Sequence, residues 1–168
     1  RAYWLSRDLI QFPKVDGSGV FKLYHSANGR VVAEKDKPVS GADGAITLVP
    51  AAGGVPAPVA ERFRFVGNGV VLSVPPGDRA ALPRLLTQQL VLVQENAAGE
   101  VQNASTAQLP GVLDDLYAAA EQVDDLGVKV GPAGTSFKLW APTAQRVAVA
   151  VYDSGLSPAS ALLPASFD

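Results

Sequence analysis

The chain has 168 residues, with 14 Lys and Arg against 16 Asp and Glu, so its net charge at pH 7 is −2. Nucleic-acid binding depends on clustered Lys and Arg, and this balance gives no reason to expect a nucleic acid as a partner. The sequence contains no cysteine, which excludes disulfides, thiolate catalysis and cysteine-based metal sites. No apolar run approaches the roughly 20 residues of a membrane helix, so no membrane span is expected.

The first part of the chain predicts strands separated by turns. Hydrophobic residues make up 48% of the sequence, enough for a packed core, and 16 Gly with 13 Pro indicate frequent turns. Residues 3–12 have an extended character, and residues 20–25 alternate between apolar and polar side chains. Asn28-Gly29 favours a tight hairpin turn, which predicts residues 30–34 as the returning strand.

The middle of the chain continues in the same way. Residues 45–49 predict a short strand, and the Ala-, Gly- and Pro-rich residues 51–58 predict a loop. Arg62-Phe63-Arg64-Phe65 alternates, so we expect a strand with both rings on one face and both guanidinium groups on the other. Two further features are predicted, a strand over residues 70–74 and a hairpin that pairs 90–95 with 100–103.

Helical signals are sparse. Asp78 is expected to cap a short helix that runs to Leu82. Residues 112–123 carry apolar side chains at helical spacing and predict a short helix or a turn-rich connector. Strand signals then resume at 128–130, 136–140 and 147–152, and the Ser-, Pro- and Ala-rich tail after Asp153 is expected to be loosely ordered.

Many short strands with regular turn signals predict an all-β fold, an antiparallel, immunoglobulin-like β-sandwich. We place the first domain at residues 1–123 and the first strands of a second, incomplete β-sandwich at residues 124–168. Three strands leave an apolar face exposed to water, which is unstable. We therefore expect the second sandwich to continue in further polypeptide beyond this chain.

Three stretches carry a family resemblance, and they stand in this order along the chain: Ala2-Tyr3-Trp4-Leu5-Ser6-Arg7-Asp8-Leu9-Ile10, Gln108-Leu109-Pro110-Gly111-Val112-Leu113-Asp114-Asp115-Leu116-Tyr117 and Phe137-Lys138-Leu139-Trp140-Ala141-Pro142-Thr143-Ala144-Gln145. The first two resemble the amino-terminal domain and linker of pullulanases and limit dextrinases. The third resembles the opening of the starch- or glycogen-type carbohydrate-binding sandwich that precedes their catalytic barrel.

The resemblance implies an amino-terminal fragment of an enzyme that hydrolyses α-1,6-glucosidic linkages in pullulan, starch or glycogen dextrins. Such enzymes place an acidic nucleophile and an acidic proton donor in a (β/α)₈ barrel of about 250 residues. No position of this chain matches that barrel, so no catalytic residue is expected here. The implied partners are the rest of the same enzyme and an α-glucan.

Four aromatic residues are candidates for a functional surface. Trp4, Phe12 and Tyr24 could form a platform for glucose rings, although Trp4 shares a face with Ile10 and Phe12, which favours the core, and a domain interface is a third alternative. If its strand is regular, Trp140 lies opposite Phe137 and Leu139, which favours an interdomain contact over ordinary burial.

Paired carboxylates do not indicate catalysis. Asp114 and Asp115 are sequence neighbours, as are Asp124 and Asp125, so neither pair can flank one glycosidic bond. No loop has the acidic spacing of a calcium site, so no metal or cofactor is expected in this fragment, although calcium remains possible in the parent enzyme.

Three hypotheses remain at this stage. The first is a non-catalytic module that packs on its neighbours and touches α-glucan weakly, and the second is a dedicated starch- or glycogen-binding module. The third is a generic interaction sandwich. The family resemblance also favours a secreted or periplasmic location.

Overall fold

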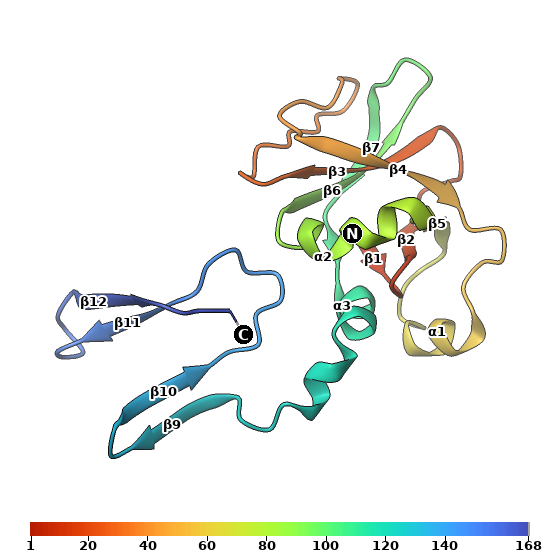
Figure 1. The fold of residues 1–168 in the computed structure, drawn as a ribbon. Helices are drawn as coiled ribbons and strands as arrows, with labels where there is room; N and C mark the ends of the chain where they lie inside the picture. Colours follow the sequence, from red (N-terminus) through yellow and green to blue (C-terminus); the bar gives the residue numbers. More distant parts are fainter. Residues whose placement is uncertain (168) are drawn as a thin grey trace.

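Eight strands form one continuous hydrogen-bonded sheet in the computed structural model, which describes residues 1–167 (Figure 1). Their order is β7-β6-β3-β4-β5-β2-β1-β8, and every neighbouring pair is antiparallel except β1 and β8. The strands are β1 (Ala2–Trp4), β2 (Leu9–Pro13), β3 (Val20–Ser26), β4 (Gly44–Pro50), β5 (Gly69–Ser73), β6 (Gln89–Glu95), β7 (Val101–Ser105) and β8 (Ala107–Gln108).

The sheet curls back on itself. Its two outer strands, β7 and β8, are consecutive in the chain and separated by Thr106 alone. The Ala2 amide donates to Ser105 Oγ at 3.1 Å, which ties β1 to the end of β7. The prediction of a mainly β fold is therefore confirmed, but the strands form one curled sheet in place of two separate ones. The sheet is continuous because β4 joins its two halves. It pairs with β3 along Gly44 to Leu48 and with β5 at Val49 and Pro50.

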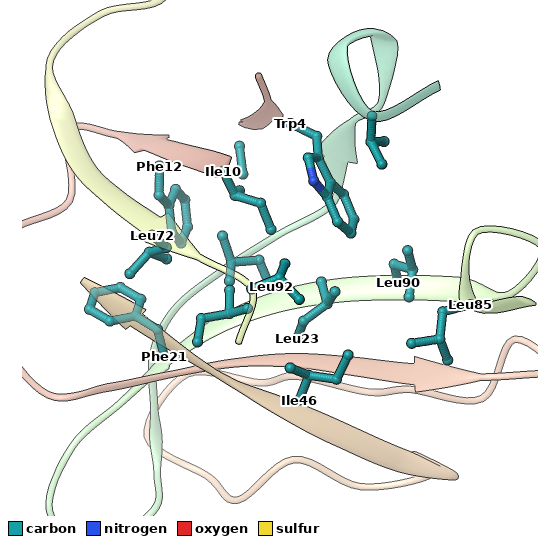
Figure 2. Close-up of a cluster of buried hydrophobic side chains, with 14 of the residues drawn as sticks. Trp4, Ile10, Phe12, Phe21, Leu23, Ile46, Leu72, Leu85, Leu90 and Leu92 are labelled. Atoms are coloured by element: carbon teal, nitrogen blue, oxygen red, sulfur yellow. The ribbon is translucent and has the colours of Figure 1, made fainter. Parts of the chain in front are cut away.

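One face of the curled sheet encloses the core. Strand alternation sends every second side chain inward, and Figure 2 shows Trp4, Ile10 and Phe12 pointing into the same cluster as Leu23 and Leu92. The inward positions of five strands supply most of the cluster: Ala2, Trp4, Ile10, Phe12, Phe21, Leu23, Ile46, Leu48, Leu90 and Leu92.

The Asn28-Gly29 turn forms, but its predicted return strand is wrong. Gly29 has a φ of 69°, and its amide donates to the Ser26 carbonyl at 3.5 Å. The strand that pairs with β3 is β4, and residues between them form a long loop with one isolated bridge, Val32 to Ser40. Val31 is buried against Val93 in a second cluster, so this segment packs against the sheet and does not extend it.

The predicted strand at Arg62-Phe63-Arg64-Phe65 is also wrong. Helix α1 (Ala57–Arg62) occupies part of the predicted Pro-rich loop and ends at Arg62, and a turn follows. Pro58 stands in the first turn of this helix, where a missing amide hydrogen has no consequence. Because the backbone turns here, Phe63 is buried and Phe65 is exposed.

Short helices connect the remaining strands. The 3₁₀ segment η1 (Pro76–Ala81) leads into α2 (Leu82–Leu85). The predicted cap by Asp78 is wrong, because Pro75 holds the N-cap position of η1 and Asp78 lies inside its first turn without a side-chain cap hydrogen bond. Helix α3 (Pro110–Leu116) and η2 (Ala118–Gln122) together confirm the helical prediction for 112–123. Within residues 1–167, no helix has the length and apolar character needed to cross a membrane.

Gly111 allows α3 to pack directly on the chain around β1. A Cβ at this position would lie 2.2 Å from the Leu5 carbonyl oxygen and 2.6 Å from the Trp4 carbonyl oxygen. We expect Gly111→Ala to lower the free energy of unfolding by about 2 kcal/mol, since the backbones must separate. Gly77→Ala is the matched control, because nothing lies within 4 Å of its added Cβ. Equal urea midpoints for the two variants would contradict this packing.

Two hairpins complete the described chain, and both lie to one side of the eight-stranded sheet (Figure 1). Strands β9 (Gly127–Gly131) and β10 (Gly134–Lys138) form one, and β11 (Ala148–Tyr152) and β12 (Ala159–Pro164) form the other. The three strands predicted after residue 123 are confirmed. The loosely ordered tail is a wrong prediction, because β12 pairs with β11 in regular register from Ala161 to Pro164.

Candidate functional site

The two hairpins and the segments beside them carry most of the exposed large apolar side chains of residues 1–167, whereas the buried core residues end at Val112. We call them the hairpin surface, which comprises Leu126, Val128, Val130, Phe137, Leu139, Trp140, Val151, Tyr152, Leu156, Leu162, Leu163 and Phe167. Single exposed apolar residues are ordinary, but exposed apolar residues in this number favour a contact surface.

A hollow of about 910 Å³ opens between the hairpins and the first part of the chain. Pro83, Thr87 and Tyr117 line it on one side, and Phe137 and Trp140 are among its lining residues on the other. The Gln145 amide joins the two sides, because Nε2 donates to the Ala27 carbonyl at 3.0 Å and to the Thr87 carbonyl at 2.9 Å. An apolar hollow of this size, open to solvent, can receive large side chains from another segment.

Trp140 lies at this hollow and is 45% exposed. Strand β10 ends at Lys138, so the regular alternation assumed from sequence does not reach Trp140. Phe137, Leu139 and Trp140 all line this hollow. The interdomain contact predicted for Trp140 stays a prediction.

The three predicted sugar-contacting rings are not brought together on a surface. Trp4 is 0% exposed and Phe12 is 5% exposed, and both belong to the core cluster (Figure 2). Neither ring offers a face to solvent in this conformation, so sugar stacking on them remains a prediction from sequence. Tyr24 is half-buried and packs against the other cluster, with Val91 and Val93.

Tyr24 also belongs to a charged group that the sequence did not indicate. Glu95, only 2% exposed, accepts hydrogen bonds from the Tyr24 hydroxyl and from Lys22 Nζ, the latter at 2.7 Å. The hydrogen bond to Glu95 raises the pKa of Lys22 above 10.5. Burial, together with the bond to Glu95, raises the pKa of Tyr24 above 10.0. The pairing of β3 with β6 is the signal that could have predicted this group. Lys22 and Tyr24 lie on the same face of β3, and Glu95 lies on the neighbouring strand β6.

The paired carboxylates make separate structural contacts. Asp114 forms an ion pair with Arg62, and Asp115 Oδ2 accepts the Arg7 amide at 2.6 Å, so α3 is attached to two other segments. Asp125 pairs with Lys138 at 3.0 Å, and this contact lowers the pKa of Asp125. Residues 1–167 contain no group of three or more His, Cys, Asp or Glu side chains arranged for a metal ion.

Tyr3, Phe63 and Phe65 form an aromatic cluster at the outer face of the sheet, which we call the exposed aromatic cluster because Phe65 is open to solvent. The sequence did not indicate this cluster as a site. Tyr3 and Phe65 meet edge to face with ring centroids 5.9 Å apart, and Phe63 and Phe65 lie 6.0 Å apart. Tyr3 is adjacent to Trp4 in the strand and thus points to the opposite face. The sequence signal that could have revealed this arrangement is Pro56 and Pro58, because proline favours the start of a helix. That helix, α1, ends at Arg62, just before Phe63.

Comparison with known proteins adds a family match. The family described as Pullulanase N2 domain matches residues 1–115. Pullulanase 1, chloroplastic, of Arabidopsis thaliana is 34% identical over 156 residues, which are 93% of this chain and 16% of that protein. The pullulanase of Klebsiella pneumoniae is 29% identical over 153 residues, 91% of this chain and 14% of that protein.

A solved structure agrees in fold along almost the whole chain. The crystal structure of Klebsiella pneumoniae pullulanase complexed with maltotriose superimposes with a TM-score of 0.77 at 28% identity. The match covers 99% of this chain and 15% of that one. The present chain thus spans about one sixth of the length of the curated relatives it matches.

Proposed function

This chain belongs to the pullulanase N2 domain family, and from that premise we propose that it is the non-catalytic amino-terminal region of a pullulanase-type debranching enzyme. The enzyme would hydrolyse α-1,6-glucosidic linkages in pullulan, starch or glycogen dextrins. Residues 1–123 would form the amino-terminal domain, and residues 124–168 would be the first strands of a second sandwich. The physical task of the region is to pack against the rest of the enzyme.

The observation that carries this proposal is the contrast between the two parts of the chain. The core cluster in residues 2–112 is enclosed by its own sheet, whereas the hairpin surface faces solvent. An isolated two-stranded hairpin is marginally stable in water and needs further strands or a packing partner. The 910 Å³ hollow and the hairpin surface supply the apolar side of such a contact.

The length of the relatives supports the same reading. The curated relatives contain about six and seven times as much chain as the matched segment, so in them this region has a large neighbouring polypeptide. We propose further polypeptide of the same enzyme as the occupant of the hairpin surface, and the secreted or periplasmic location and any calcium site as properties of that longer protein. A dedicated starch- or glycogen-binding module is the alternative, and the buried positions of Trp4 and Phe12 do not favour it.

Hydrogen exchange tests the packing role. We expect the amides of β9 to β12 to exchange at least ten-fold more slowly in the longer enzyme than in residues 1–168, because covering a hairpin suppresses its local opening. The amides of β6, which lies between β7 and β3 in the sheet, serve as the internal reference and should not change. In the longer enzyme Trp140→Ala should restore fast exchange, while Val32→Ala, which removes a similarly exposed apolar side chain outside the hairpins, should not.

Two results would contradict the proposal. Equal exchange of the hairpins in the short and long proteins would show that nothing covers them. If the gene that encodes this chain encodes no barrel domain with paired carboxylates, the proposed debranching activity of the parent enzyme would be contradicted.

A further inference from the structure

The exposed aromatic cluster borders a hollow of about 430 Å³ between α1 and the outer face of the sheet. Gln11 and Val71 line it from the sheet, and Phe63, Arg64 and Asn68 line it from the segment after α1. Tyr3 on β1 pairs in register with Gln11 on β2, so the Tyr3 ring and the Gln11 amide lie side by side on this face. The volume lies at the lower end of the range for small-molecule sites.

Phe65 is exposed yet held in a defined position. Its side chain is 67% exposed, but one edge meets Tyr3 at an interplanar angle of 77° and another side meets the buried Phe63 at 51°. An aromatic ring fixed by two ring contacts loses little further freedom when a ligand stacks on it.

Amide groups beside the rings are available for hydrogen bonds. Gln11 Nε2 donates to the Gly67 carbonyl at 2.9 Å, which orients this amide and leaves its Oε1 without a partner among residues 1–167. The Asn68 side chain makes no hydrogen bond within the described chain. An amide presents a donor and an acceptor close together, which suits the adjacent hydroxyl groups of a sugar.

The charges around the cluster cancel. Arg62 stacks on the Phe63 ring at 5.1 Å and forms an ion pair with Asp114. Arg64 pairs with Glu61 at 3.1 Å. Both guanidinium groups are therefore neutralised by carboxylates, and this disfavours an anionic ligand such as a phosphate. A neutral ligand with an apolar face and a polar rim fits the surface best.

A protein partner fits less well. Stable protein interfaces bury about 800 Å² of surface on each side, with few charged residues at the centre. The cluster offers two exposed or half-exposed rings surrounded by Arg, Glu, Gln and Asn side chains. The hairpin surface provides what a protein partner needs, and this cluster does not.

We infer that Tyr3 and Phe65, with Gln11 and Asn68 beside them, form a binding site for a neutral α-linked glucose oligosaccharide. The pyranose ring stacks its C–H face on Phe65, and its hydroxyl groups hydrogen-bond to the two amides. The geometry by itself selects a neutral sugar, and the α-glucan class rests on the proposed function.

Titration of residues 1–168 with maltotriose, followed by amide chemical shifts, tests the site. We expect shifts confined to residues around Tyr3, Gln11, Phe65 and Asn68. Phe65→Ala should weaken maltotriose binding at least ten-fold, Asn68→Ala several-fold, and Phe65→Tyr less than two-fold, because the ring is retained. Tyr152→Ala, which removes an exposed ring of the hairpin surface, is the matched control and should leave the affinity unchanged.

Each contrary outcome overturns a distinct statement. The absence of shifts, shifts located elsewhere, or unchanged affinity of Phe65→Ala would overturn the site, and an unchanged amide spectrum of the variant shows that the fold is intact. Tighter binding of the β-linked cellotriose than of maltotriose would overturn the α-glucan class. The packing role is measured separately by hydrogen exchange of the hairpins, so failure of the sugar site and failure of the proposed packing remain distinguishable.

Discussion

Replacing Trp4 by alanine is expected to lower the free energy of unfolding by about 4 kcal/mol, the range found for large buried aromatic residues. Trp4 is 0% exposed and lies among the inward side chains of β1, β2, β3 and β6 (Figure 2). Its removal leaves a cavity at the centre of the curled sheet, where rigid strands on several sides limit collapse. Urea denaturation monitored by circular dichroism measures the change.

Two further variants separate burial from the presence of an aromatic ring. Phe65→Ala removes an exposed ring and should change the free energy of unfolding by less than about 1 kcal/mol. Trp4→Phe should be much milder than Trp4→Ala, because the ring volume is mostly kept and the buried Trp4 Nε1 has no hydrogen-bond partner to lose. A Trp4→Ala variant as stable as Phe65→Ala would contradict the core assignment.

Local signals predicted the elements whose partners lie nearby in the sequence. The hairpin of β6 and β7 is confirmed, because five residues separate its strands and Gly99 takes a φ of 79° in the turn. The Asn28-Gly29 turn has the same chemistry, yet its return strand is wrong. The conformation of the segment after this turn is determined by the burial of Val31 against residues some 60 positions away. A short sequence pattern contains no information about such a contact.

The candidate site shows the same division between local and distant information. Strand alternation correctly placed Trp4, Ile10 and Phe12 on one face, which is the core face. Alternation also implies that Tyr3 faces outward, but the ring that meets Tyr3 comes from Phe65, beyond a helix that the pattern of Arg62-Phe63-Arg64-Phe65 concealed. Four alternating residues fit a strand and a turn equally well, so the aromatic cluster becomes visible only when the chain is folded.

The buried carboxylate of Glu95 carries the second large expected effect. Glu95→Ala is expected to lower the free energy of unfolding by about 3 kcal/mol, because Lys22 and Tyr24 lose the acceptor that compensates their partial burial. Lys22 retains one third of its side-chain exposure, which keeps the effect below that of a fully buried pair. Glu34→Ala breaks the exposed pair with Lys37 and should change stability by less than about 0.5 kcal/mol. Similar urea midpoints for the two variants would contradict the role of Glu95.

The pH dependence of stability identifies the same group. The pKa of Lys22 is raised above 10.5 in the folded chain, chiefly by the hydrogen bond to Glu95, so its stabilising charge is fully present below pH 10.5 and is lost as the pH rises through the folded value. The pKa of Tyr24 is raised above 10.0, first by burial and then by Glu95, and it acts in the same direction. Wild-type stability should therefore fall with rising pH above about 10. In Glu95→Gln the fall should be shallower but present, because the carboxylate that raises the pKa of Lys22 is gone while the burial of Tyr24 remains. Identical alkaline profiles for the two proteins would show that Glu95 does not hold these protons.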